Sequence, residues 1–349
     1  MKRCACVHGH FYQPPRENPW TGAVERQLSA GRDHDWNARI ARECYIPNTE
    51  ARMVDGEGRI IDIVDNYAWM SFNFGPTLLA WLEKAHPHAY ARILEADRVS
   101  AQRLGGHGNA IAQAFHHSIL PLASARDRTT EIRWGLADFR KRFGRESEGM
   151  WLPECAVDNA TLMAVAAEGV KFVILEPHQA AGPVAQGVPY QWSYGTLRLA
   201  IFFYDGAMSR AVAFERAMSD SRAFAARISA SVPPTAEDGL TLLATDGESY
   251  GHHESFAEMG LAHFLRYALP EKGVDPVNLG WYLAKHPPRK EVRLQPEPTS
   301  WSCEHGVERW RSDCGCGVTG HTRQDWRAPL RAALEGLRGK LDGLYETQA

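Results

Sequence analysis

The sequence lacks a long hydrophobic run, a disulfide framework and an excess of either charge. No window approaches the roughly 18 apolar residues of a membrane-spanning helix. The N-terminal stretch is too short and too polar after Val7 for a secretory signal, so we expect a cytoplasmic location. The seven cysteines are odd in number and unevenly spaced, a poor basis for disulfide pairing.

The charges are balanced and mixed. The chain of 349 residues carries 39 basic and 42 acidic residues, which are interleaved along its length. Without a basic stripe or a polybasic segment, we expect neither nucleic acid nor a membrane as a partner. The sequence gives no indication of the oligomeric state.

What the chain does contain is an alternation of apolar runs and helical patterns. The runs typical of buried strands cover residues 3–10, 149–154, 171–177, 197–205 and 240–248. Most of them precede a helical pattern, which favours an α/β fold, either a barrel or a doubly wound sheet. Polar residues gather where the runs stop, so we expect the functional site at the carboxyl ends of the strands.

Three segments depart from this alternation. Residues 77–104 and 130–143 have long helical patterns, and residues 51–62 resemble a hairpin that turns at Asp55 and Gly56. Residues 283–317 are rich in Pro, Gly, Trp and Cys and are predicted to form an ordered loop, followed by an amphipathic helix.

The first candidate for chemistry is the pair His8 and His10. Because the two residues are two apart in a predicted strand, their side chains point to the same side. Such a pair can bind a metal or the hydroxyls of a substrate, and it can equally be structural packing.

The second candidate is Glu154, which ends an apolar run. It is either an acid at the start of a helix, favoured by the helix dipole, or a nucleophilic carboxylate with Trp151 beside it as a stacking surface.

The third candidate is the segment 244–254, which is dense in titratable groups. Asp246 and Glu248 follow the apolar run 240–243. A turn needs one acid, whereas this segment has several. Together with Glu154, Asp246 supplies the two carboxylates at two strand ends that acid-assisted glycoside cleavage requires.

The last candidate is the group Cys303, His305, Cys314 and Cys316. These are the elements of a zinc site, but the spacing C-x-H-x8-C-x-C lacks the C-x2-C knuckle of common structural sites. We therefore predict no metal here, and favour a folded lid that carries His305 and Trp310 toward the cleft.

Several ordered motifs make the sequence resemble glycoside hydrolase family 57, whose members include α-amylases, 4-α-glucanotransferases and branching enzymes. Residues 8–16 (HGHFYQPPR), 149–154 (GMWLPE) and 246–251 (DGESYG) resemble its first, nucleophile and acid/base motifs. Residues 107–122 resemble its second region, and residues 301–310 a diverged fifth motif. In place of a common Gly-Gln-x-Glu, this chain has GHGN at 106–109, which makes His107 and Asn109 candidates for the polar contacts there.

The resemblance implies a distorted (β/α)7 barrel over residues 1–255, completed by a helical and loop-rich region at 256–349. It also implies a retaining mechanism on α-glucan or a related oligosaccharide, without a cofactor or catalytic metal. Glu154 would be the nucleophile and Asp246 the general acid/base. The residues implied to bind the substrate are His8, His10, His117, Trp151, Glu248, His305 and Trp310.

Two other functions are open to these residues. In a metal-dependent, deacetylase-like hydrolase, His8, His10 and acids of segment 244–254 would bind a divalent cation that activates water. In a non-catalytic glycan-binding protein, the barrel and its aromatic residues would remain without turnover.

Overall fold

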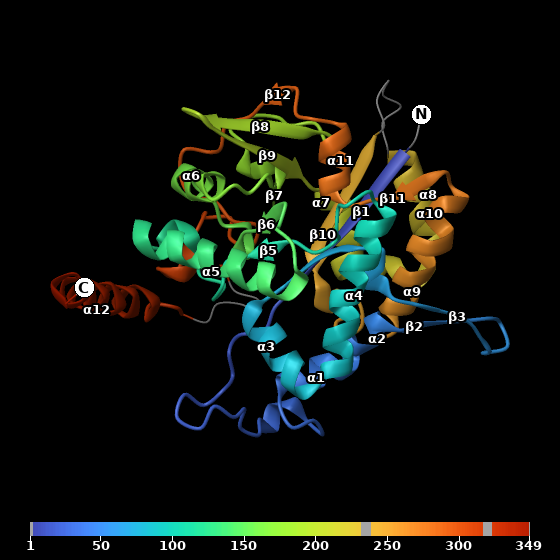
Figure 1. Ribbon diagram of the computed structural model, residues 1–349, viewed down its shortest axis with the longest axis horizontal. Helices are drawn as coiled ribbons and strands as arrows, with labels where there is room; N and C mark the ends of the chain where they lie inside the picture. The colour runs from blue at the N-terminus through green and yellow to red at the C-terminus, as the bar shows by residue number, and fades with distance from the viewer. Residues whose placement is uncertain (1–2, 232–238, 317–322, 349) are drawn as a thin grey trace.

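The computed structural model describes residues 3–231, 239–316 and 323–348. At its centre lies β1 (Arg3–Phe11), which is buried from Cys4 onward. One edge of β1 pairs in parallel with β10 (Leu240–Asp246). It also pairs in parallel with β11 (Val274–Pro276) near its start and with β4 (Ser71–Phe74) near its end (Figure 1).

A second sheet has the strand order β12-β8-β9-β7-β6-β5. Its strands are β5 (Ala112–Gln113), β6 (Gly149–Trp151), β7 (Phe172–Leu175), β8 (Pro189–Tyr194), β9 (Leu197–Phe203) and β12 (Lys290–Glu291). All neighbours are parallel except β8 and β9, which form an antiparallel pair. All five predicted strand runs are therefore strands of these two sheets.

The two sheets meet at two joints. An isolated parallel bridge joins Phe72 of β4 to Ala110, just before β5. On the other side, the backbone amide of Asp205 donates to the carbonyl oxygen of Leu242 in β10 (2.7 Å). The strands β1, β4, β5, β6, β7, β9 and β10 thus follow one another around a distorted (β/α)7 barrel, as predicted, but the ladder between the described strands is not continuous.

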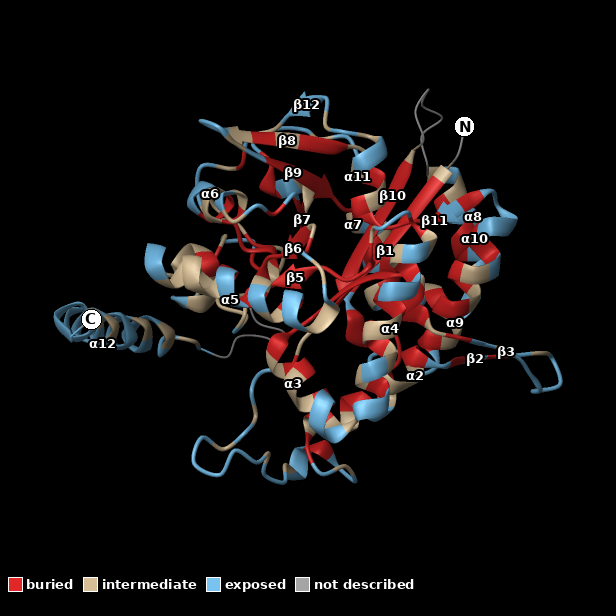
Figure 2. Cartoon of the chain, in the orientation of Figure 1, coloured by how far each residue is buried: buried red, intermediate tan, exposed pale blue. Residues whose placement is uncertain are grey.

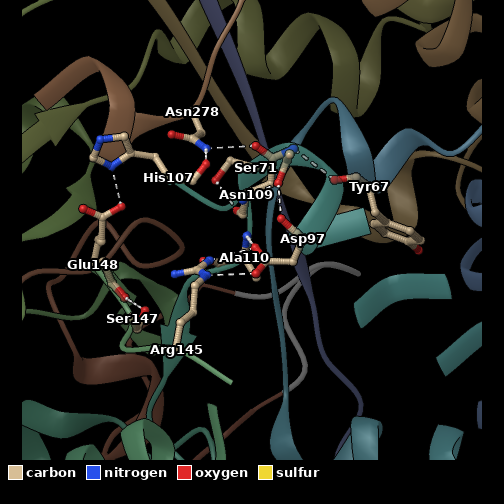
Figure 3. A network of polar contacts seen from close by, with 12 residues as sticks. Tyr67, Ser71, Asp97, His107, Asn109, Ala110, Arg145, Ser147, Glu148 and Asn278 are labelled. Carbon is tan, nitrogen blue, oxygen red and sulfur yellow. Dashed lines mark hydrogen bonds and ion pairs between the residues drawn. The ribbon is translucent and has the colours of Figure 1, made fainter. Parts of the chain in front are cut away.

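A buried polar network reinforces the joint between β4 and β5 (Figure 3). The backbone of Asn109 accepts a hydrogen bond from the amide of Phe72 (3.0 Å), and its side chain donates to the carbonyl oxygen of Tyr67 (3.0 Å). Asn278 donates to the side-chain oxygen of Asn109 (3.0 Å). Asn109 precedes β5 and so lies at the opposite end of the strand from the expected site.

The same network includes an ion pair and a hydrogen bond between a histidine and a carboxylate. Arg145 pairs with buried Asp97 (2.7 Å), which also accepts from the backbone amide of Ala110 (2.7 Å). His107 pairs with Glu148 (2.8 Å). In this structure the polar contacts that His107 and Asn109 make are with Glu148, Tyr67 and Asn278, which lie around the joint between the sheets.

Helices surround the sheets, and the last of them, α12, extends away from the rest of the molecule (Figure 1). They are α1 (Trp36–Ile40), α2 (Ile46–Thr49), α3 (Pro76–Ala85), α4 (Pro87–Arg103), α5 (Ala125–Phe143), α6 (Asn159–Ala167), α7 (Gly206–Phe214), α8 (Ser221–Ser231), α9 (Ala257–His263), α10 (Leu269–Glu271), α11 (Leu279–Lys285) and α12 (Arg327–Gln348). The pattern predicted at 77–104 is split between α3 and α4, because the residue before Pro87 avoids helical backbone angles.

Burial follows the same arrangement (Figure 2). The barrel strands β1, β4, β5, β6, β7, β9 and β10 are almost entirely buried, whereas β12, the outer faces of the helices and all of α12 are in contact with solvent. The predicted hairpin is present as β2 (Ala51–Val54) and β3 (Ile60–Val64). Within the described residues, no helix is long and apolar enough to cross a membrane.

Contacts cross the predicted boundary at residue 255. β11 lies beyond it and pairs with β1, with Val274 opposite Arg3. Further along, the backbone amide of Trp301 donates to the carbonyl oxygen of Glu154 (3.0 Å). The C-terminal region therefore contributes both to the first sheet and to the surroundings of Glu154.

Candidate active site

A buried histidine cluster lies where β1 ends. The ring of His8 contacts Ser71 Oγ through Nδ1 (2.9 Å) and Asn73 Oδ1 through Nε2 (3.0 Å). The amide nitrogen of Asn73 is 2.9 Å from Nδ1 of His10, and Nε2 of His10 is 2.9 Å from Nε2 of His117. An amide nitrogen can only donate, so Nδ1 of His10 accepts and its proton is on Nε2.

Burial keeps these histidines neutral. It lowers the pKa of His8 to about 3 and that of His117 to about 4. The pKa of His10 lies well below its usual value, because of burial and the neighbouring histidines. Near neutral pH the cluster is therefore uncharged, and the ring nitrogens of His8 and His10 contact protein groups.

Trp151 packs against the histidine cluster inside the protein. Its ring stacks on His8 and on His10, each at 5.0 Å between centroids, and meets the ring of Trp301 edge-on. Because these rings leave Trp151 fully buried, the expectation that it offers an open stacking surface is wrong in this structure. Trp301, which is half-buried, borders a pocket instead.

Glu154 lies on a strained turn after β6. Its backbone is left-handed (φ 59°), as is that of Cys155 (φ 47°), a conformation that costs about 1–2 kcal/mol per non-glycine residue. The carboxylate accepts hydrogen bonds at Oε2 from Ser302 Oγ (2.5 Å) and Trp301 Nε1 (3.1 Å). The helix-start explanation fails, since α6 is capped by Asp158, whose side chain accepts from the amide of Thr161 (2.7 Å).

Asp246 ends β10 and is in register with His10. It faces a pocket of about 320 Å³, whose other lining residues include Glu176, Tyr204, Arg210, Phe214, Trp301 and Ser302. Although the carboxyl is open to this pocket, protein surrounds it on most sides. Desolvation, followed by the negative charge of Glu154, raises the pKa of Asp246 to about 6.

Glu248 lies behind Asp246. Its side chain is buried and accepts a short hydrogen bond from Tyr45 Oη (2.5 Å). Burial and the charge of Asp246 raise the pKa of Glu248 to about 8. Glu248 can therefore hold a proton near neutral pH, and its protonation is coupled electrostatically to Asp246.

Comparison with known proteins places this barrel in a family. The sequence model described as glycosyl hydrolase family 57 matches residues 33–292, about three quarters of the chain. The chain belongs to glycosyl hydrolase family 57.

Individual relatives within and around the family are distant. Alpha-amylase 1 of Dictyoglomus thermophilum is 26% identical over 107 residues, which cover 31% of this chain and 15% of the amylase. The 4-alpha-glucanotransferase of Thermococcus litoralis superposes with a TM-score of 0.64 at 17% identity, over 84% of this chain and 42% of the transferase. The branching enzyme of Pyrococcus horikoshii gives a TM-score of 0.63 at 17% identity, over 88% of this chain and 74% of the enzyme. The chain thus spans less than half of the first two proteins.

Two predicted site residues of this family 57 chain lie elsewhere than expected. His305 contacts Cys316 (3.5 Å from Nδ1 to Sγ), within a group that also contains Cys303 and Cys314. Trp310 borders a surface hollow between α12 and residues 118–134. The predicted lid therefore differs from the structure: Trp301 and Ser302 reach Glu154, whereas His305 joins the cysteines.

The structure also adds residues that the sequence did not single out. Ser71 and Asn73 hold His8, Tyr45 holds Glu248, and Ser302 holds Glu154. Ser71 and Asn73 gave one usable signal, since they are buried polar residues that alternate with Phe72 and Phe74 in β4. Tyr45 and Ser302 gave none, because they reach the site from distant segments.

Proposed function

We propose that this chain is a retaining glycoside hydrolase or transglycosylase that acts on α-glucan or a related oligosaccharide. The observation that carries the proposal is the difference between its two carboxylates. Glu154 accepts two hydrogen bonds, which stabilise a negative charge, while Asp246 is electrostatically coupled to it and has its pKa raised to about 6.

In the first step Glu154 attacks the anomeric carbon while Asp246 protonates the departing glycosidic oxygen. In the second step Asp246, now a carboxylate, removes a proton from water or from a sugar hydroxyl, which displaces Glu154. This scheme requires the two carboxyl groups to lie roughly 5–5.5 Å apart. The neutral histidines His8, His10 and His117 would bind the sugar at the cleavage point.

The choice of substrate class rests on family membership. The relatives named above are an amylase, a glucanotransferase and a branching enzyme. Whether the acceptor is water or a sugar is decided by product analysis on a panel of α-glucans, where a transferase gives longer or branched products and a hydrolase gives reducing sugar.

The metal-dependent alternative finds less support at these residues. Both ring nitrogens of His8 and of His10 already contact protein groups, so a cation would have to break these hydrogen bonds. Activity that is lost to a chelator and restored by a cation bound at His8 and His10 would reverse this ranking. Glucan binding without turnover would instead favour the glycan-binding alternative.

The replacement Glu154→Ala tests the nucleophile. We expect turnover of α-glucan to fall by at least about 10³-fold while the circular dichroism spectrum is unchanged. Added azide should restore activity and yield a glycosyl azide with inverted configuration, because azide attacks the anomeric carbon from the side on which the Glu154 carboxylate lies in the wild type. Glu57→Ala, in the exposed hairpin, is the matched control. Full activity of Glu154→Ala would rule out this assignment.

A further inference from the structure

The loop from Thr299 to Cys316 carries a second polar cluster beside the candidate active site. Cys303, His305, Cys314 and Cys316 each offer one ligand atom, and these four atoms all lie within 4.8 Å of one another. Two of the separations are 3.9 Å, between the sulfurs of Cys303 and Cys314, and 3.5 Å, between Cys316 Sγ and His305 Nδ1.

Two of the six separations between these atoms match the edges of a tetrahedral zinc site. With Zn–S bonds of about 2.3 Å and Zn–N bonds of about 2.0–2.1 Å, tetrahedral geometry sets sulfur–sulfur edges of about 3.8 Å and sulfur–nitrogen edges of about 3.5 Å. The two measured separations are within about 0.1 Å of these values. Three thiols and one imidazole also form one of the usual donor sets of structural zinc.

The backbone allows the four ligands to converge. Gly306 (φ 78°) turns the chain after His305, and a Cβ there would lie 2.3 Å from the carbonyl oxygen of Pro298. Gly315 (φ 77°) turns the chain between Cys314 and Cys316, so that both thiols face the same point.

The loop buries little apolar surface of its own, and hydrogen bonds within it and to the barrel supply the rest of its constraints. Between residues 301 and 316 the buried side chains are Cys303 and Val307. A segment with so small an apolar contribution gains order from a further constraint, and a structural metal supplies one. Nevertheless this loop places Trp301 and Ser302 against Glu154.

We propose that Cys303, His305, Cys314 and Cys316 bind one structural Zn²⁺, which fixes the loop that holds Glu154. With four protein ligands the coordination sphere is closed, so the ion leaves no position for a substrate or water and takes no part in bond cleavage. Binding displaces the thiol protons to solvent. The proposal that a metal binds here does not depend on the proposed glycosidase activity. The proposal that the metal affects Glu154 does rest on that activity.

Metal analysis of the full chain tests the site. The protein is expressed with added zinc and purified by gel filtration. Elemental mass spectrometry should then find about one Zn²⁺ per chain. Cys314→Ser and Cys316→Ser should each lose most of the metal, while Cys6→Ala, which removes a buried thiol elsewhere, should keep it. Wild-type protein without metal, or with metal that these replacements do not affect, would overturn the proposal.

A second measurement covers variants that fail to fold. Co²⁺ added to the metal-free wild-type chain should give the thiolate charge-transfer and tetrahedral d–d absorption bands of a cobalt–thiolate site. Zn²⁺ should bleach these bands by displacing Co²⁺. A chain that binds Co²⁺ without these bands, or whose Cys303 and Cys314 form a disulfide under reducing conditions, would contradict the site.

The link to Glu154 is tested by combining zinc removal with Ser302→Ala. If the ion acts by positioning Ser302 and Trp301, zinc removal should lower kcat more than it raises KM, re-addition should restore kcat, and the two losses should be less than additive. Unchanged kcat in zinc-free protein would refute the link while leaving the metal site intact. Absence of any glycosidase activity would refute the proposed function and leave the metal analysis unaffected.

Discussion

The ends of β6 and β10 present the same chemical group in opposite surroundings. At the end of β6, Glu154 is fixed by donors from the loop at 299–316 and sits on left-handed backbone. At the end of β10, Asp246 receives no hydrogen bond on its carboxyl from the described residues, and it faces a pocket. Hydrogen-bond donors contact the first carboxyl, whereas desolvation and the charge of Glu154 raise the pKa of the second.

The different roles proposed for the two carboxyl groups depend on segments that lie far apart in the chain. Glu154 depends on residues nearly 150 positions later, whereas Asp246 depends on its own strand end and on the charge of Glu154. Changes to the donors should therefore affect the nucleophile first. Changes to Glu154 should affect both roles.

The largest effect after loss of Glu154 is expected for Asp246→Asn. It removes the proton donor, and general acid catalysis contributes about 10²–10⁴-fold, so kcat/KM on α-glucan should fall by that factor. A substrate with a good leaving group, such as a 4-nitrophenyl glycoside, should be cleaved with a smaller loss in the first step, because it needs no protonation. Equal losses on both substrates would mean that Asp246 is not the acid.

A smaller effect is expected for Ser302→Ala. Hydrogen bonds to charged groups contribute about 1.5–3 kcal/mol, so kcat should fall by about 10- to 100-fold. Ser302→Thr keeps the hydroxyl and should retain more activity. If steady-state kinetics show Ala and Thr variants with the same loss, the hydroxyl is not what holds Glu154.

Trp301→Phe should cost less than Ser302→Ala. It keeps an aromatic ring at the pocket but removes the longer of the two hydrogen bonds to Glu154 (3.1 Å against 2.5 Å). We expect a loss of a few-fold in kcat with little change in KM. A much larger loss, matched by Trp301→Leu, would indicate that the ring binds the substrate.

The most subtle effect concerns pH. Because the acid form of Asp246 is needed, kcat/KM should decline as pH rises through its pKa of about 6. In Glu154→Gln a neighbouring negative charge is absent, so the pKa of Asp246 should fall. NMR titration of the Asp246 carboxyl in both proteins measures the shift directly, with wild type as the reference. A pKa that rises or stays constant would show that the two carboxyls are not coupled.

Much of the barrel could be predicted because its strands are continuous apolar runs. The positions of His8, Glu154 and Asp246 followed from the same pattern, since parallel strands bring their carboxyl ends together. The family resemblance added His117 to this group, and the structure brings it to His10. The local sequence therefore sufficed to predict the position of a site side chain wherever that side chain lies on a strand or at its end.

The rest depends on contacts between distant segments. Trp151 was expected to face a sugar, but whether a ring is open or covered depends on neighbours that periodicity does not reveal. Ser302 and Tyr45 lie in segments with no strand pattern. His305 was assigned to the cleft because the spacing of the cysteines is unusual, and only the folded loop shows that the spacing still brings four ligands together.

The left-handed turn at Glu154 has a consequence for how the gene could be shortened. Residues 33–292, the part that matches the family, include Glu154 and Asp246 but not Trp301. Strained backbone persists only where its surroundings enforce it, and here the amide of Trp301 binds the carbonyl of Glu154 itself. A fragment that ends at residue 292 would keep both acids in its sequence, yet its turn would be free to relax into an inactive shape.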